Sequence, residues 1–135
     1  MSKIQWDPIY SVHVRVIDAQ HQRFVGIINE LDDAIRQKRV DEELGAIFDE
    51  LLAYAKMHFE TEETYMDKFN YAGAADHKAA HAMLSAQLMQ YRSQYDTDKT
   101  VLSAQLAEFL FDWFTHHSVG MDKLYTKCFN EHGLT

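Results

Sequence analysis

The chain contains one proline and five glycines in 135 residues, so few positions can end a helix. Between those positions, apolar residues recur every three or four residues, which is the spacing of one face of an α-helix. We expect four helices, at about residues 18–39, 41–70, 74–95 and 98–129, with Asp98 as N-cap of the last one. Because the links between them are short, neighbouring helices should run antiparallel. The sequence therefore predicts an all-α fold, an antiparallel up-down-up-down four-helix bundle.

Residues 1–17 lack this helical periodicity and are expected to form an N-terminal arm. They contain the only proline, Pro8, and the alternating residues Val12, Val14 and Val16. The alternation would suit a short strand, but an extended arm packed on the bundle is the favoured interpretation. A chain of this length is typical of one domain, so residues 1–135 are expected to form a single unit.

The composition excludes several classes of protein. A hydrophobic content of 47% favours a globular domain, and the formal net charge of −8 argues against nucleic acid or an anionic membrane as the main partner. No segment is apolar over the length of a transmembrane helix, and the N-terminus lacks the apolar run of a signal peptide. The single cysteine, Cys128, cannot form an internal disulfide, so the cytoplasm is the expected location.

Seven side chains that bind metals well continue the apolar faces of the predicted helices. They are His21, His58, Glu62, His77, His81, His117 and Asp122. The start of the first and third helices and the end of the second and fourth lie at the same end of an antiparallel bundle, so these residues should meet. A single histidine on an apolar face is more often a hydrogen-bonded core residue than a ligand. Convergence of five histidines with two carboxylates favours a metal site instead.

The spacing of the last two candidates makes a specific demand on the fourth helix. His58 and Glu62 are four residues apart, as are His77 and His81, so each pair differs in direction by only about 40°. His117 and Asp122 are five residues apart and differ by roughly 140° on a regular helix. Both can face the site only if a bulge, kink or helix end separates them. Gly120 lies between them and is the residue that could permit one.

The number of ligands indicates two ions. Imidazole together with carboxylate suits iron, zinc, copper or nickel, and a structural zinc site is closed by four ligands, so seven are too many for one ion. If both carboxylates and one solvent-derived oxo or hydroxo group bridge two irons, the five histidines divide three and two. One ion is then closed, and the other keeps one vacant position for a small ligand such as O2.

Several segments resemble the hemerythrin family, more closely its bacterial members, the bacteriohemerythrins. They are residues 17–21, 58–63, 77–81 and 113–122, with Trp6 and Tyr10 in the arm. The resemblance implies a di-iron centre that binds O2 reversibly, for storage, transport or delivery, rather than an enzyme. It also implies that Glu62 and Asp122 bridge the ions together with an oxo or hydroxo group. The histidines that hold the closed iron would be His77, His81 and His117, and those that hold the open iron would be His21 and His58.

The resemblance further suggests which side chains surround bound O2. Phe59, beside His58, would line the pocket, and Phe24 and Trp113 are core residues that could also belong to its wall. Ser118 departs from the family pattern, which usually has a bulky aliphatic residue, often isoleucine, after the last ligand histidine. A small hydroxyl side chain there could open a channel or admit water.

Two other functions remain open on the sequence alone. One is a di-iron enzyme that reduces peroxide or nitric oxide or oxidises Fe(II), although ferritin-like di-iron enzymes use several glutamates and this set has two carboxylates. The other is an O2-sensing or redox-sensing module, which would need a separate output domain. We expect a monomer or weak oligomer, with O2 as ligand and an O2-consuming protein as a conceivable recipient.

Overall fold

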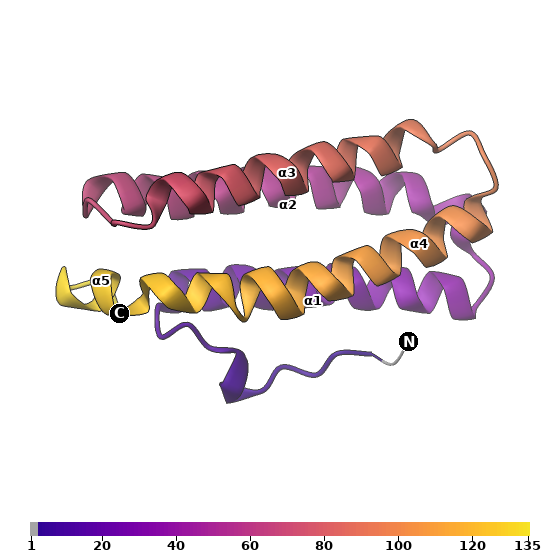
Figure 1. Ribbon diagram of the computed structural model, residues 1–135. Helices are drawn as coiled ribbons and strands as arrows, with labels where there is room; N and C mark the ends of the chain where they lie inside the picture. Colours follow the sequence, from indigo (N-terminus) through magenta and orange to yellow (C-terminus); the bar gives the residue numbers. More distant parts are fainter. Residues whose placement is uncertain (1–2) are drawn as a thin grey trace.

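The computed structural model describes residues 3–135 and consists of four long helices with an arm along one side (Figure 1). The helices are α1 (Arg15–Arg36), α2 (Val40–Lys68), α3 (Ala74–Ser93) and α4 (Lys99–Asp112). Helix α1 packs on α2 and α4, and α2 packs on α3 and α4. No strand occurs within residues 3–135. The predicted all-α four-helix bundle is confirmed.

The first two links are tight because each contains one residue with a left-handed backbone. Lys38 has a φ of 56° and Asn70 a φ of 52°. At each link the amide that follows this residue reaches back five residues, from Arg39 N to Ala34 O (2.8 Å) and from Tyr71 N to Met66 O (2.9 Å). This is the hydrogen bond of a Schellman helix end, and it reverses the chain within a few residues.

The fourth helical segment differs from the prediction of one continuous helix over residues 98–129. Asp98 caps α4 as expected, accepting hydrogen bonds from Thr100 N at 3.0 Å and Val101 N at 3.3 Å. Regular α-helix then ends at Asp112. It is followed by the π-helix η2 (Trp113–Ser118), the 3₁₀-helix η3 (Met121–Tyr125) and the short helix α5 (Thr126–Glu131). The expectation of an unbroken helix was wrong, whereas the demand for a break between His117 and Asp122 was correct.

The arm is irregular apart from the short 3₁₀-helix η1 (Pro8–Tyr10), and hydrogen bonds hold it against α1. The side chain of Asn29 binds the backbone of Ile4 twice, at 2.9 and 2.8 Å, and Asp18 accepts a hydrogen bond of 2.8 Å from Val12 N. Val12 and Val14 are both fully buried. Their alternation therefore reflects packing of an extended arm, as favoured above, while α1 begins at Arg15, earlier than expected. Residues 1 and 2 of the predicted arm lie outside the described residues.

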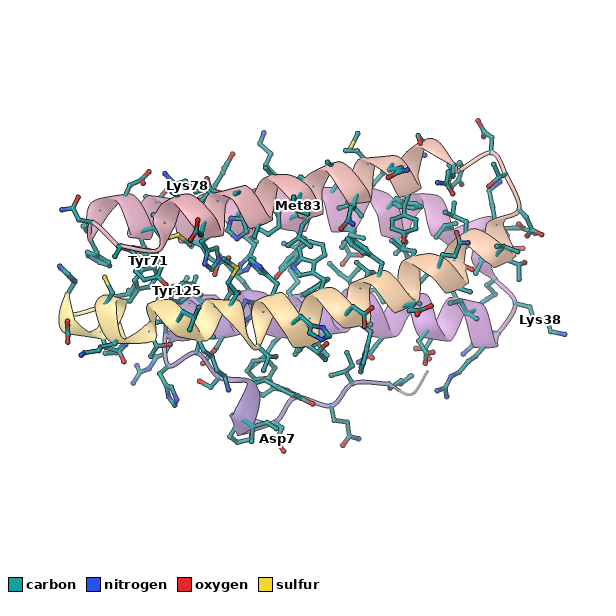
Figure 2. All side chains as sticks on the ribbon, in the orientation of Figure 1. Asp7, Lys38, Tyr71, Lys78, Met83 and Tyr125 are labelled. Atoms are coloured by element: carbon teal, nitrogen blue, oxygen red, sulfur yellow. The ribbon has the colours of Figure 1, made fainter. Side chains whose placement is uncertain are left out.

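Two apolar clusters fill the interior of the bundle. The larger fills the length of the bundle and includes Phe24, Tyr54 and Trp113. The smaller lies at the end where α5 and the start of α3 meet, and consists of Val12, Val14, Ile17, Met66, Tyr125 and Phe129. Aliphatic and aromatic side chains fill the interior between the helices (Figure 2). The polar residues described next lie between these two clusters and are thereby separated from water.

Helix α3 contributes little to either cluster. Only His77, His81 and Leu88 of its residues are buried, and Met83 and Met89 are 67% and 54% exposed. Its main packing partner is α2. Two of the three buried side chains on this helix are thus imidazoles, so polar groups anchor α3 where apolar residues anchor the other helices.

Candidate metal centre

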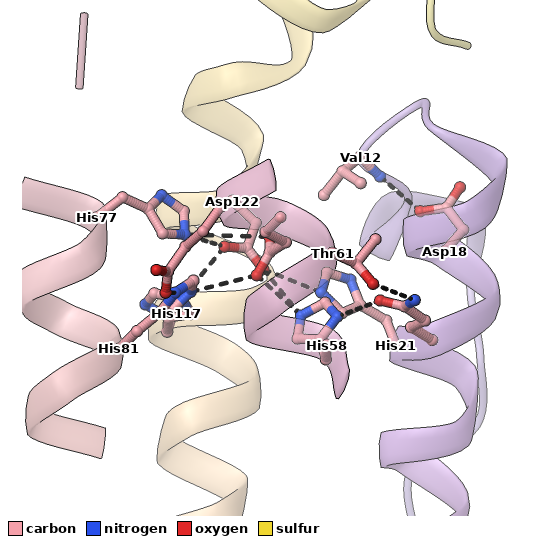
Figure 3. A network of polar contacts seen from close by, with 12 residues as sticks. Val12, Asp18, His21, His58, Thr61, His77, His81, His117 and Asp122 are labelled. Atoms are coloured by element: carbon pink, nitrogen blue, oxygen red, sulfur yellow. Dashed lines mark hydrogen bonds and ion pairs between the residues drawn. The ribbon is translucent and has the colours of Figure 1, made fainter. Parts of the chain in front are cut away.

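The seven predicted ligand residues come together at one place in the bundle (Figure 3). They fall into two overlapping groups whose potential ligand atoms lie within 4.8 Å of one another. The first group comprises Glu62, His77, His81, His117 and Asp122, and the second comprises His21, His58, Glu62 and Asp122. Both carboxylates belong to both groups. The histidines therefore divide three and two, as the ligand count predicted.

Each helix delivers its ligands between the two apolar clusters. On α1, His21 follows Ile17 of the smaller cluster and precedes Phe24 of the larger one. On α2, His58 and Glu62 lie between Tyr54 and Met66. Residues three or four apart share one helix face, so the apolar contacts on either side fix the direction of the ligands between them. All seven residues are at most 7% exposed.

Asp122 contacts both histidine groups, with a different oxygen for each. Its Oδ2 lies 2.9 Å from Nε2 of His21, whereas its Oδ1 lies 2.8 Å from Nε2 of His77 and 3.2 Å from Nε2 of His117. Glu62 also reaches both groups, because its Oε1 lies 3.0 Å from Nε2 of His58 and 3.3 Å from Nε2 of His81. Each carboxylate is therefore placed between the two groups, as a bridging ligand would be.

These contacts do not satisfy the polar atoms involved. The Nε2 atoms of all five histidines and all four oxygens of Glu62 and Asp122 are buried without a properly aligned hydrogen-bond partner in the described residues. Buried polar atoms are otherwise nearly always paired, because leaving one unpaired costs several kcal/mol (about 2–7). Nine orphaned atoms that face a common centre are explained by ions at that centre, and imidazole nitrogens with carboxylate oxygens are the donors that iron accepts. The residues present therefore fit a di-iron group.

Outer hydrogen bonds hold two of the rings with Nε2 toward the centre. Nδ1 of His58 lies 2.6 Å from Oε1 of Gln20, and Nδ1 of His81 lies 2.8 Å from Oε2 of Glu63. A proton on Nδ1 leaves the Nε2 lone pair free for a metal ion, which is the usual arrangement of a ligand histidine. Sequence reasoning did not identify Gln20, which lies 38 residues from its partner.

Without metal, the surroundings favour the protonated imidazoles of His21 and His81 and the charged carboxylates of Glu62 and Asp122. Burial acts to raise the pKa of Glu62, but the adjoining rings of His58 and His81 outweigh it and bring that pKa to about 2. At Asp122 burial also acts to raise the pKa, but His117, His21 and His77 hold it well below its ordinary value. For His21 and His81 burial acts to lower the pKa, yet the neighbouring carboxylates raise it. A metal ion at His21 or His81 therefore competes with a proton that is held more tightly than on a free imidazole.

The break in the last helical segment is what brings Asp122 to the site. In η2, Val119 N donates to Phe114 O at 2.9 Å, a five-residue step that places an extra residue in the turn. Gly120 follows at a point where no side chain fits, because a Cβ atom there would lie 2.5 Å from the carbonyl oxygen of His116. The glycine singled out from the sequence is thus required by a close backbone approach, next to the π-helix that supplies the turn.

An aromatic wall closes the site toward the larger cluster. Phe59 stacks on His81 with ring centroids 4.0 Å apart, and the ring centroid of Phe24 lies 4.6 Å from that of Trp113. Tyr54 stacks on His58 at 5.3 Å and was not singled out from the sequence, although it lies one helical turn before that ligand. Ser118 is 1% exposed and its hydroxyl is buried, so this side chain does not itself open the site to solvent.

Tyr125 closes the opposite side and was also missed. It lies three residues after Asp122, and its ring is 5.7 Å from that of His77. Burial, together with the charges of Glu62 and Asp122, raises the pKa of its phenol well above 10, so the group stays neutral near pH 7. The i, i+3 spacing from a ligand was the signal that could have found it.

The remaining histidines lie away from the cluster. His13, His116 and His132 are exposed, and the last two contact backbone carbonyls of their own helical segments. Across residues 3–135, none of the helices combines the length and the apolar character that crossing a membrane demands.

Comparisons with known proteins agree with this geometry. The model of the family described as "Hemerythrin HHE cation binding domain" matches residues 12–128. Bacteriohemerythrin from Methylococcus capsulatus is 31% identical over 119 residues, which are 88% of this chain and 90% of that protein. A hemerythrin-like protein from Naegleria gruberi is 27% identical over 124 residues, with 92% of each chain covered.

Solved structures give the same result. A wild-type hemerythrin crystal structure superimposes with a TM-score of 0.84 at 30% identity, covering 94% of this chain and 98% of that one. The crystal structure of a hemerythrin mutant gives the same TM-score over 95% of this chain and 98% of that one.

Proposed function

Because this chain belongs to the hemerythrin family of HHE cation-binding domains, we propose that it binds O2 reversibly at a centre of two iron ions. The observation that carries the proposal is the set of nine buried, unpaired nitrogen and oxygen atoms that face one point from four helical segments. Bound irons would supply the electrons and the vacant coordination position that reversible O2 binding requires.

We assign the ligands from the two overlapping groups. His77, His81 and His117 would hold one iron, and His21 and His58 would hold the other. Glu62 and Asp122 would bridge them, together with an oxo or hydroxo group from solvent. The oxygens of Asp122 face different histidine groups, which supports the bridging role. The ion with two histidines keeps the open position.

The surrounding residues keep water and protons away from that position. Phe24, Tyr54, Phe59 and Trp113 form an aromatic wall of which no member is more than 6% exposed. Its one ionisable group is the phenol of Tyr54, whose pKa burial raises well above 10. A dry wall whose one ionisable group holds its proton tightly near neutral pH favours release of intact O2 over its reduction. This favours O2 storage, transport or delivery over an enzymatic role.

Iron analysis together with an O2 cycle tests the proposal. The reconstituted protein should contain two irons per chain. After reduction, adding O2 should produce visible absorption bands that disappear under argon and return with O2. One iron per chain, bands that never reverse, or continuing turnover of peroxide would contradict it.

A further inference from the structure

Two of the five cluster histidines have outer partners of different charge. Nδ1 of His81, in the group of three histidines, faces a carboxylate oxygen of Glu63 at 2.8 Å. Nδ1 of His58, in the group of two, faces the amide oxygen of Gln20 at 2.6 Å. The centre is therefore asymmetric in its surroundings as well as in its number of histidines.

The contact between His58 and Gln20 places a neutral amide oxygen, and no charge, against Nδ1 of His58. The hydroxyl of Thr61 donates to Met57 O at 2.9 Å, so its oxygen can only accept from Gln20 Nε2, which lies 3.1 Å away (Figure 3). The amide is thereby oriented with Oε1 toward His58, whose Nδ1 carries the proton. This chain therefore holds Nδ1 of His58 with a neutral partner.

The contact with Glu63 differs in charge and in position. Glu63 follows Glu62 on α2 and reaches across to α3, the helix with the least apolar anchoring. Its side chain is 33% exposed and lines a surface groove of about 390 Å³ that Lys78 and His81 also line. Lys78 binds Asp67 at 2.6 Å, so this lysine has a carboxylate partner other than Glu63.

We propose that Glu63 is a positioning residue that acts through His81 and lowers the reduction potential of the centre. This inference rests on the di-iron function proposed above. A carboxylate that accepts from Nδ1–H fixes the imidazole and makes Nε2 a more basic ligand. A more basic ligand stabilises the higher oxidation state of the ion it holds. The iron held by His77, His81 and His117 is therefore easier to oxidise than it would be beside a neutral partner.

Substitutions that change charge without changing shape separate the electronic role from a structural one. Glu63→Gln retains an acceptor for His81 but removes the charge. It should keep two irons per chain and shift the reduction potential of the centre to more positive values. Gln20→Glu adds a charge beside His58 and should shift the potential in the opposite direction. Glu60→Gln is the matched control, because Glu60 lies on α2 and lines the same groove, whereas the carboxylate that His81 contacts is that of Glu63.

A second readout is independent of iron and O2. The metal-free chain is titrated with Co²⁺, whose visible bands report its ligands. Glu63→Ala removes the acceptor as well as the charge and should weaken Co²⁺ binding about 10–100-fold, the usual effect of losing an outer partner of a ligand histidine. Glu63→Gln should weaken it less than Glu63→Ala.

Equal shifts in potential for Glu63→Gln and Glu60→Gln would overturn the electronic role. A Gln20→Glu shift in the same direction as Glu63→Gln would also overturn it. Unchanged Co²⁺ binding in Glu63→Ala would overturn the positioning role. Failure of the wild-type chain to hold two irons or to release O2 would contradict the proposed function, while the Co²⁺ titration would still decide whether Glu63 positions His81.

Discussion

The α-carbon of Gly120 passes so close to the carbonyl oxygen of His116 that a Cβ atom would lie 2.5 Å from it. This approach directly follows the π-helix and leads the chain to Asp122, the residue whose two oxygens contact both histidine groups. The backbone contact and the bridging position are thus consecutive features of one turn.

Gly120→Ala should therefore damage the metal centre. The backbone must shift to relieve the clash, and Asp122 moves with it. We expect iron content below two per chain and a loss of about 1–3 kcal/mol in the free energy of unfolding, typical of overpacking. Metal analysis and chemical denaturation measure the two effects. Gly26→Ala is the control, because a Cβ at that helical glycine meets nothing within 4 Å. It should retain both irons and gain up to about 1 kcal/mol; equal behaviour of the two variants would contradict the argument.

The same turn shows what the sequence could and could not predict. Leu102, Leu106 and Phe109 continue into Trp113 and His117 in steps of three and four, which an α-helix and a helix with a π-turn share. Hydrophobic spacing therefore predicted a continuous helix. Only the five-residue step to Asp122 disclosed a break, because a metal cluster requires both side chains to face inward.

Contacts between side chains on different helices could not be predicted from the sequence, for a related reason. Periodicity places Gln20 on the more polar side of α1, but its partner His58 is 38 positions away on another helix. The rotation of α1 against α2 decides whether the two meet, and that rotation follows from packing of the whole core. The ligands themselves could be predicted because several lie in i, i+4 pairs and all lie at one end of an antiparallel bundle.

Ser118 provides a test of how dry the site is. Its hydroxyl is buried without a hydrogen-bond partner, one residue after His117. Ser118→Ile replaces this buried hydroxyl with an apolar side chain and should slow the irreversible oxidation of the O2-loaded protein in air, followed by visible absorption. Ser118→Ala removes only the hydroxyl and should cost little stability, since an unpaired buried polar group is lost. Equal oxidation rates in wild type and Ser118→Ile would rule out an influence of this residue on water access.

The metal-free protein should be most stable at mildly acidic pH. The pKa of His21 and His81 is raised above 6.5 by nearby carboxylates, so their stabilisation is complete below about pH 6.5 and is lost as pH rises through the raised values. The pKa of Glu62 is lowered from 4.5 to about 2, so its stabilisation is present above pH 4.5 and is lost as pH falls toward 2. Denaturation of metal-free protein between about pH 3 and pH 9 should show a maximum at about pH 4.5–6.5. Stability that keeps rising above about pH 7 would contradict this assignment.

Removal of metal should loosen α3 before any other helix. Two of its three buried side chains, His77 and His81, belong to the metal cluster, and the third is Leu88. Helix α1, in contrast, buries seven apolar residues outside the cluster: Ile17, Phe24, Val25, Ile27, Ile28, Leu31 and Ala34. Without ions, the two imidazoles of α3 keep only their contacts with the carboxylates of the cluster and of Glu63, and the free energy that holds the helix in place is reduced. Hydrogen exchange should therefore be faster across α3 in the metal-free protein than in the loaded protein, with much smaller changes in α1.

Leu88→Ala sharpens this comparison because it truncates the one fully buried apolar side chain of α3. Truncating a buried leucine costs about 2–5 kcal/mol, so in metal-free protein it should release α3 almost completely. With both irons bound, the same variant should keep α3 protected, because His77 and His81 still attach the helix to the centre. Equal protection of α3 with and without metal in the wild-type chain would show that apolar packing on α2 is sufficient, and that the metal centre does not hold this helix in place.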